Sequence, residues 1–252
     1  MIRNLLKLFL KAFIKKFGYK LLNLENDEFR QFNKNDQSIV NLYSQYSMTS
    51  DLRRLALLKS FHYIKDNKIK GDFVECGVWE GGNIMTLNHL ENIYKTNQKI
   101  YAYDTFLGMS EPTKFDIKIK DGTIATKKFE KFKDEDNFSE WDKCTIEKVI
   151  ENFTKHNLDM DNLNLIKGKV ESTLLDKNNL PENISLLRLD TDFYESTKIE
   201  LEKLYPLLSK GGVLIIDDYG AWQGAKKAVD EYFKDTVVWM HYIDHDCRLI
   251  IK

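Results

Sequence analysis

This sequence has little cysteine, little proline and almost no excess charge. Its three cysteines, Cys76, Cys144 and Cys247, lie far apart without a CxxC motif, which indicates neither a zinc site nor a disulfide framework. We therefore expect a reducing, cytoplasmic location. Lysine and arginine number 38 against 39 aspartate and glutamate, so the net charge of -1 gives no global reason to expect a nucleic acid partner.

Long uncharged hydrophobic runs are also lacking. The first twenty residues carry six basic side chains and no acid, interleaved with leucine, isoleucine and phenylalanine. This pattern predicts a basic amphipathic helix, because its longest apolar run is far below the roughly 18 residues that a membrane span needs. Two interpretations stay open: peripheral contact with an anionic membrane, or packing on the domain or on a second subunit of a homodimer.

The length of 252 residues suits one large α/β domain with a buried core. We place this domain at residues 43–252, after an N-terminal helix and linker at residues 1–42. Short β-rich runs alternate with segments of helical periodicity. The predicted strands are Asp72–Val78, Lys99–Asp104, Leu163–Lys169, Ile184–Asp190, Gly212–Asp218, Thr236–Ile243 and Cys247–Lys252. The predicted helices between them include Gly82–Tyr94, Thr145–His156, Lys198–Ser209 and Trp222–Lys234.

The alternation of strands and helices predicts a Rossmann-like α/β fold, with a seven-stranded, mostly parallel sheet and helices on both faces. Only the residues around His245 separate Ile243 from Cys247, which leaves room for a hairpin and not for a crossover helix. The last strand must therefore run antiparallel. The sheet of a dinucleotide dehydrogenase usually continues with parallel strands instead.

Residues 105–144 form a segment too long for an ordinary connection between a strand and a helix, which takes about 2–6 residues. The segment follows the second strand, and so begins at the carboxyl edge of the sheet, where open α/β sheets bind ligands. It mixes aromatic and charged residues. We interpret it as a lid over a substrate, and the alternative is a surface excursion with a small core of its own.

The first strand runs into a glycine turn and then into a helix, through Glu75, Gly77, Val78, Gly81 and Gly82. Glycines let the backbone approach a ligand closely, and the free N–H groups of a helix N-terminus favour a carboxylate or phosphate. The turn departs from the GxGxxG motif. An acid at the strand end suits a ligand with an amino group, such as S-adenosylmethionine, better than it suits a pyrophosphate.

The second strand ends at Asp104, at a distance downstream that suits an acid accepting hydrogen bonds from a ribose diol. The alternative is that Asp104 only caps the turn before Phe106. The third strand places Gly168 and Val170 where an adenine can rest.

Two further strands end in acids, the fourth with Asp190 and Asp192 and the fifth with Asp217 and Asp218. Adjacent parallel strands bring these carboxylates together, where they repel one another unless a cation neutralises them. An all-oxygen set suits Mg²⁺, Mn²⁺ or Ca²⁺ rather than zinc. The alternative is that these acids cap the helices that follow, as Asp192 before Glu195 can do.

Four segments in this order resemble the macrocin O-methyltransferase family of sugar-modifying enzymes that use S-adenosylmethionine. They are Gly71–Trp79, Tyr103–Met109, Leu187–Thr197 and Asp217–Ala225. The resemblance covers about residues 43–252 and is loose in the insertion and in the first forty residues. It implies the class I methyltransferase variant of the Rossmann-like sheet.

The resemblance also implies methyl transfer to a sugar hydroxyl, with Mg²⁺ (or Mn²⁺) held by Asp190, Asp217 and Asp218, and with Asp190 as the general base. Contacts to the cofactor would fall on the strand ends: Glu75, Gly77, Val78, Asp104, Thr105, Phe106, Gly168, Val170, Ser172 and Asp190. Thr191 departs from the pattern, because a glycine is expected between the two acids.

With its Lys-, Asn- and Ile-rich composition and divergent insertion, the chain looks more like the family members that decorate bacterial surface polysaccharides. The resemblance therefore implies an acceptor for capsule or other surface polysaccharide, such as a nucleotide-linked hexose or heptose. Within methyltransferases, a natural-product sugar or a phenolic small molecule is the alternative acceptor. Outside them, a nicotinamide-dependent oxidoreductase has no use for the carboxylates at the strand ends, and a Rossmann-like binding module would keep the fold and lose the metal.

Overall fold

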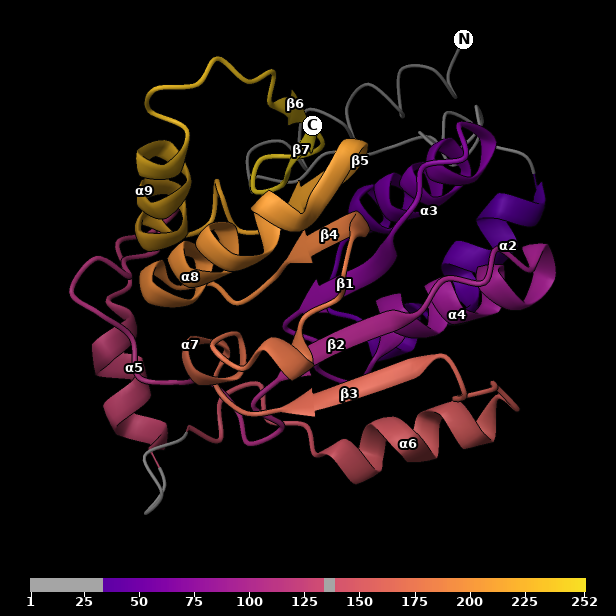
Figure 1. Ribbon diagram of the computed structural model, residues 1–252. Coiled ribbons are helices and arrows are strands. Elements are labelled where there is room, and N and C mark those ends of the chain that lie inside the picture. The colour runs from indigo at the N-terminus through magenta and orange to yellow at the C-terminus, as the bar shows by residue number, and fades with distance from the viewer. Residues whose placement is uncertain (1–33, 134–138) are drawn as a thin grey trace, which may run out of the picture. The chain divides into compact units, whose positions relative to one another are not determined.

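The computed structural model describes residues 34–133 and 139–252 (Figure 1). Most of the predicted N-terminal helix and linker, residues 1–42, therefore lies outside the described residues, apart from helix α2 (Lys34–Leu42). One compact unit comprises Ile39–Lys252. Among the described helices none is both long and apolar enough to cross a membrane.

The described residues form a seven-stranded sheet in the order β3-β2-β1-β4-β5-β7-β6. The strands are β1 (Asp72–Cys76), β2 (Ile100–Asp104), β3 (Leu163–Lys167), β4 (Ile184–Leu189), β5 (Leu208–Ile216), β6 (His241–Tyr242) and β7 (Arg248–Ile251). Strands β1 to β5 pair in parallel, and β7 runs antiparallel to both of its neighbours. The predicted fold class, including the antiparallel last strand, is confirmed.

The predicted sixth strand, Thr236–Ile243, is too long. Only His241 and Tyr242 pair, with Leu249 and Arg248 of β7. Of the residues before them, Val237 and Trp239 are exposed, whereas Val238 and Met240 are partly buried against the core. At the edge of a sheet a strand extends only as far as its single neighbour offers partners, and β7 has four residues.

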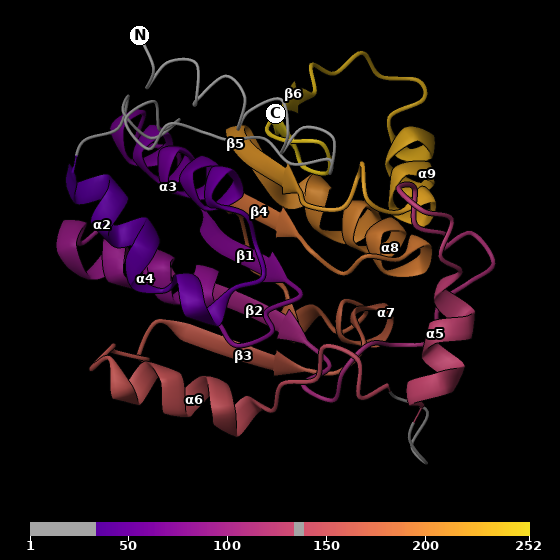
Figure 2. The ribbon, with the colours of Figure 1, turned by 180° about the vertical axis from the view of Figure 1, so that it is seen from behind.

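The helices between the strands lie on both faces of the sheet (Figures 1 and 2). On one face are α3 (Asp51–Asp66), α4 (Gly82–Tyr94) and α6 (Ile146–Lys155), with the short helix η3 (Ser44–Tyr46) against α4. On the other are α7 (Val170–Thr173), α8 (Tyr194–Leu204) and α9 (Gln223–Tyr232). Helix α8 begins and ends earlier than the predicted Lys198–Ser209, and the short helix η5 (Tyr205–Leu207), which contains Pro206, follows it. Another short helix, η4 (Lys177–Asn179), lies between α7 and β4.

Strand β4 lies at the centre of the sheet, and all six of its residues are buried. Its near-continuous apolar sequence is typical of a parallel strand covered on both faces. Arg188 is the exception, a guanidinium that is only 1% exposed. The core on one face packs Leu187 and Leu189 against Leu201 and Leu214.

The parallel register brings the strand ends into line, because Cys76 pairs with Leu189 and Leu189 pairs with Ile216. The residues that follow these ends must therefore lie side by side. Gly77 has φ +83°, and a Cβ there would lie 1.9 Å from the carbonyl oxygen of Asp190. Only glycine permits this approach of two backbones.

The insertion between β2 and β3 contains helix α5 (Ala125–Phe132), which lies beyond the carboxyl ends of the strands, near α8 and α9 (Figure 1). Asp116 anchors it. The buried Asp116 carboxylate accepts hydrogen bonds from the backbone N–H of Tyr194 (2.8 Å), at the start of α8, and from the N–H and hydroxyl of Thr113 (2.6 and 2.8 Å). A side chain of the insertion thus supplies the N-terminal cap of a core helix.

Gly224→Ala should lower stability. In a helix this change usually stabilises by roughly 0.5–1 kcal/mol, but the new Cβ would lie 1.8 Å from Asp116 Oδ1. Crowding of this kind costs about 1–3 kcal/mol, so we expect a lower urea midpoint and thermal midpoint for the variant. Stability equal to or above that of the parent chain would contradict the contact between α9 and the insertion.

Candidate functional site

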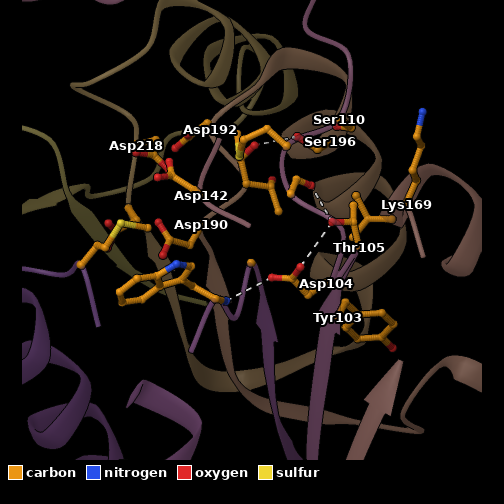
Figure 3. A pocket seen from close by; sticks show the side chains of 18 of the residues that line it. Tyr103, Asp104, Thr105, Ser110, Asp142, Lys169, Asp190, Asp192, Ser196 and Asp218 are labelled. Atoms are coloured by element: carbon orange, nitrogen blue, oxygen red, sulfur yellow. Dashed lines mark hydrogen bonds between the residues drawn. The ribbon is translucent and has the colours of Figure 1, made fainter. Parts of the chain in front are cut away.

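One pocket opens at the carboxyl edge of the sheet, between the strand ends and the insertion (Figure 3). It is bordered by the ends of β1, β2, β4 and β5, by the start of α7, and by residues of α3 and the insertion. Its lining residues are Met48, Thr49, Arg53, Gly77, Trp79, Tyr103, Asp104, Thr105, Gly108, Met109, Ser110, Asp142, Gly168, Lys169, Val170, Glu171, Asp190, Thr191, Asp192, Ser196, Asp217 and Asp218.

The glycine turn after β1 is held by Asp104. The backbone N–H groups of Val78 and Trp79 donate to Asp104 Oδ2 at 2.7 and 3.1 Å, and the N–H of Phe106 donates to Oδ1 at 2.7 Å. Trp79 and Phe106 have φ values of +47° and +52°. Left-handed backbone is rare outside glycine, and such residues often cluster at functional sites. Asp104 therefore fixes the turn and also faces the pocket.

The pocket brings together six of the ten residues that the sequence suggested for cofactor binding, Gly77, Asp104, Thr105, Gly168, Val170 and Asp190. The other four do not line it. Val78 and Phe106 are buried and reach this region through their backbone N–H groups. Ser172 is exposed on α7 outside the pocket lining.

Glu75 also departs from the expected role. Its side chain is 2% exposed and lies behind the pocket. Glu75 Oε1 accepts hydrogen bonds from Arg188 Nη1 (2.5 Å) and from Asn83 Nδ2 (3.0 Å). Glu75 is thus paired with the guanidinium of Arg188, where the sequence suggested the amino group of a ligand as its partner. Burial raises the pKa of Glu75, although Arg188 opposes the rise.

Arg188 joins three carboxylates from three strands. Its Nη1 lies 2.5 Å from Glu75 Oε1 and 2.8 Å from Asp190 Oδ2, and its Nη2 lies 2.8 Å from Asp217 Oδ1. Burial alone would lower the pKa of Arg188, but the carboxylates of Asp190, Asp217 and Glu75 raise it well above the usual value. Arg188 was not among the residues predicted from the sequence, where its only signal is a single charge inside an apolar strand.

A second arginine was also missed. Arg53 on α3 makes ion pairs with Asp217 (2.6 Å), with Asp244 (2.8 Å) and with Asp246 (2.8 Å). The last two acids lie in the turn between β6 and β7. Asp217 is therefore engaged by two guanidinium groups, one from β4 and one from α3.

Asp190 also belongs to a second acidic group, together with Asp192 and Asp218. One oxygen each of Asp190, Asp192 and Asp218 lies within 4.8 Å of the others. The trio expected from the sequence shares Asp190 and Asp218 with this group but has Asp217, which faces the arginines, in place of Asp192. Figure 3 shows the group on one side of the pocket and Asp104 on the other.

Burial and mutual repulsion disfavour the charged forms of these acids. Burial raises the pKa of Asp190 and Asp218 well above the usual range and that of Asp192 to about 7, and neighbouring acids add to each rise. Asp218 Oδ2 is buried and has no hydrogen-bond partner among the described residues. A buried acceptor without a donor costs free energy, and a hard cation would remove that cost.

Thr191 fits the turn although glycine was expected there. The left-handed residue is Asp192, with φ +66°, and aspartate tolerates this conformation better than most residues. The Thr191 hydroxyl donates to Glu200 Oε1 of α8 at 2.9 Å. Glu200 is fully buried, and burial raises its pKa well above the usual value.

This fold and pocket define a Rossmann-like protein of the class I methyltransferase type. The family described as Macrocin-O-methyltransferase (TylF) matches residues 6–249, and the chain belongs to that family. The resemblance drawn from the sequence is confirmed.

Two curated relatives are O-methyltransferases. The demethyldecarbamoylnovobiocin O-methyltransferase of Streptomyces niveus is 30% identical over 168 residues, covering 66% of this chain and 59% of the relative. The mycinamicin III 3''-O-methyltransferase of Micromonospora griseorubida is 28% identical over 166 residues, covering 65% and 61%. The matches thus span about three fifths of the length of these relatives.

Solved structures agree with the fold. The O-methyltransferase NovP superposes with a TM-score of 0.69 at 25% identity and covers 82% of both chains. The calicheamicin methyltransferase CalS11 superposes with a TM-score of 0.60 at 17% identity and covers 92% of this chain and 98% of its own.

Arg188→Met should strongly destabilise the protein, because three acids would lose their shared cation. Breaking a buried ion pair on one side costs about 3–5 kcal/mol. The variant's uncompensated acids have folded pKa values above the unfolded ones, so its deficit should be small near pH 4 and grow as the pH rises. Urea unfolding at several pH values measures this. A deficit no larger than that of Lys226→Met, which breaks an exposed pair with Asp230, would contradict it.

Proposed function

We propose that this chain transfers the methyl group of S-adenosylmethionine to a sugar hydroxyl, assisted by Mg²⁺ or Mn²⁺. The observation that carries the proposal is the pocket itself, in a chain of this family. A glycine turn braced by Asp104 forms one wall, and the clustered carboxylates of Asp190, Asp192 and Asp218 form the other.

The cofactor side is the wall formed by Gly77, Asp104, Gly168 and Val170. Gly77 has no side chain, so a ligand can approach the end of β1 closely. Asp104 holds the turn by accepting three backbone N–H bonds, and the Thr105 hydroxyl donates mainly to the carbonyl of Gly108. Because a carboxylate offers about four acceptor positions, about one remains for a ribose hydroxyl. A methyltransferase from Podospora anserina, solved with bound S-adenosylhomocysteine, has a related fold (TM-score 0.50, 15% identity).

The cation side is the group of Asp190, Asp192 and Asp218. The donor set is all oxygen, Asp218 Oδ2 has no partner in the described chain, and each pKa is raised, which fits a hard divalent cation. When bound, such a cation makes the proton of an acceptor hydroxyl easier to remove. Asp190 and Asp218 belong to both the expected and the observed trio.

Asp190 is the proposed general base. Arg188 Nη1 holds Asp190 Oδ2 at 2.8 Å, which orients the carboxylate toward the pocket. The acceptor oxygen forms a bond to the methyl carbon while the bond from that carbon to sulfur breaks, and the hydroxyl proton passes to Asp190. S-adenosylhomocysteine then leaves. The pocket walls supply the in-line alignment that this displacement requires.

For the acceptor we propose a nucleotide-linked hexose or heptose destined for capsule or another surface polysaccharide. Support for a sugar comes from the names of similar proteins: one structure of CalS11 is described as a TDP-rhamnose 3'-O-methyltransferase. A relative from Streptomyces olivaceus is named for a rhamnosyl-tetracenomycin acceptor. A natural-product sugar or a phenol is the second candidate. Membrane contact, a homodimer and a cytoplasmic location remain predictions from the sequence.

Asp104→Asn should weaken the binding of S-adenosylhomocysteine about tenfold, because one hydrogen bond to a charged group contributes roughly 1.5–3 kcal/mol. Isothermal titration calorimetry measures the change. Asp121→Asn, an exposed site in the insertion, is the matched control and should leave the affinity unchanged. Equal affinities for the parent and Asp104→Asn would remove Asp104 from the cofactor site.

EDTA should abolish methyl transfer, and added Mg²⁺ should restore it.

Asp190→Asn should lose turnover while binding S-adenosylhomocysteine, and Asp218→Asn should lose the response to Mg²⁺. Asp192→Asn should raise the Mg²⁺ concentration needed for half-maximal rate, whereas Asp217→Asn should mainly lower stability, since Asp217 pairs with two arginines. If instead Asp217→Asn raised the Mg²⁺ requirement and Asp192→Asn did not, the cation ligands would be Asp190, Asp217 and Asp218, as expected from the sequence. Full activity in EDTA would exclude the cation.

A further inference from the structure

The insertion contributes a carboxylate of its own to the pocket. Asp142 lines the pocket and has a left-handed backbone, with φ +53°. In Figure 3 its side chain extends toward Asp192 and Asp218, which come from the ends of β4 and β5. Its charge is felt at Asp192, whose pKa it helps to raise after burial and Asp190. Neither the cofactor wall nor the trio of acids includes Asp142.

The backbone around Asp142 is held firmly. The N–H of Met109 donates to the carbonyl of Trp141 at 3.2 Å, and the N–H of Ser139 donates to the carbonyl of Met109 at 3.1 Å. A Cβ on Gly108 would lie 1.8 Å from the carbonyl oxygen of Ser139, so the two segments touch. These backbone hydrogen bonds hold Asp142 at the edge of the pocket.

The neighbouring side chain adds a second anchor. The ring of Trp141 packs against Phe193 and Trp222, each with ring centroids 6.0 Å away, and Lys128 Nζ lies 3.4 Å from the centroid of the Trp141 ring. Trp141 thus ties the insertion to residues just after the acids of β4 and β5. This contact and the backbone pairing fix the position of Asp142 at the pocket, and left-handed residues often cluster at functional sites.

Asp142 lies outside the group of acids proposed to hold the cation, so a bound cation leaves its carboxylate available. A carboxylate accepts hydrogen bonds from hydroxyl groups and repels an anionic substituent. A glycosyl group with free hydroxyls supplies several donors at once and no charge.

We propose that Asp142 positions the acceptor by accepting a hydrogen bond from a sugar hydroxyl next to the one that is methylated, so that the pocket selects neutral glycosyl groups over uronates. This inference rests on the proposed function, since it takes the acid side of the pocket as the acceptor side. Asp142 is a specificity-determining residue that remains distinct from the proposed base, Asp190.

The test uses the full chain, tritiated S-adenosylmethionine, Mg²⁺ and three probes. The glycosyl groups of dTDP-rhamnose and UDP-glucose are neutral, and that of UDP-glucuronate carries a carboxylate. The variant Asp142→Asn keeps the size and the left-handed tendency of the residue and removes its charge. Asp121→Asn is the control, because it removes a charge from an exposed part of the same insertion.

We expect the parent chain to methylate a neutral probe and to discriminate against UDP-glucuronate. In Asp142→Asn the KM for the neutral probe should rise about tenfold, equivalent to about 1.4 kcal/mol, with little change in kcat, and the discrimination against UDP-glucuronate should shrink. The affinity for S-adenosylhomocysteine and the Mg²⁺ requirement should not move. Asp121→Asn should match the parent in every measurement.

Two results for Asp142→Asn would overturn the inference: an unchanged KM, or a higher Mg²⁺ requirement, which would make Asp142 a cation ligand. Two results for the parent chain would also overturn it: equal transfer to UDP-glucuronate, or no transfer to either neutral glycosyl group although S-adenosylhomocysteine binds. Failure of the proposed function is distinguishable, because the parent chain would then not bind S-adenosylhomocysteine at all.

Discussion

The structure depends on one buried guanidinium, that of Arg188. It enters the centre of the sheet on a strand whose other five residues are apolar or small, and it is tolerated there because three carboxylates surround it. An isolated charge at that depth would be costly, and so would each of the acids alone. The arginine and its acids therefore have to be assembled together, which ties β1, β4 and β5 to one another at the edge where the pocket opens.

The charges follow an order outward from this centre. Glu75 lies deepest and accepts from Arg188 and Asn83. Asp217 is shared by Arg188 and Arg53, and Asp190 has one oxygen on Arg188 and a partly exposed position at the pocket. Asp192 and Asp218 form the acidic group at the pocket with Asp190, and this least compensated part of the site is where a bound cation is proposed.

Local patterns in the sequence were enough for the sheet, its antiparallel ending, the glycine turn and the acids at the strand ends, because these depend on periodicity and on where parallel strands stop. The partners of those acids could not be predicted. Arg53 meets Asp217 and Asp244 across more than a hundred and sixty residues of chain, and Glu75 is turned inward by Arg188, a contact set by strand register. How the turn accommodates Thr191 in place of the expected glycine could not be predicted for a similar reason, since Glu200 on the next helix accepts a hydrogen bond from its hydroxyl.

The contact between Asp116 and Gly224 has a consequence for how such proteins diversify. A buried aspartate caps α8, and the absence of a side chain on α9 leaves room for it. A second contact is made by Trp141, which packs on Phe193 and Trp222. An insertion exchanged into this chain would have to keep both contacts, and the residues between them are the ones in which a new acceptor preference could be introduced while α8 and α9 stay in place.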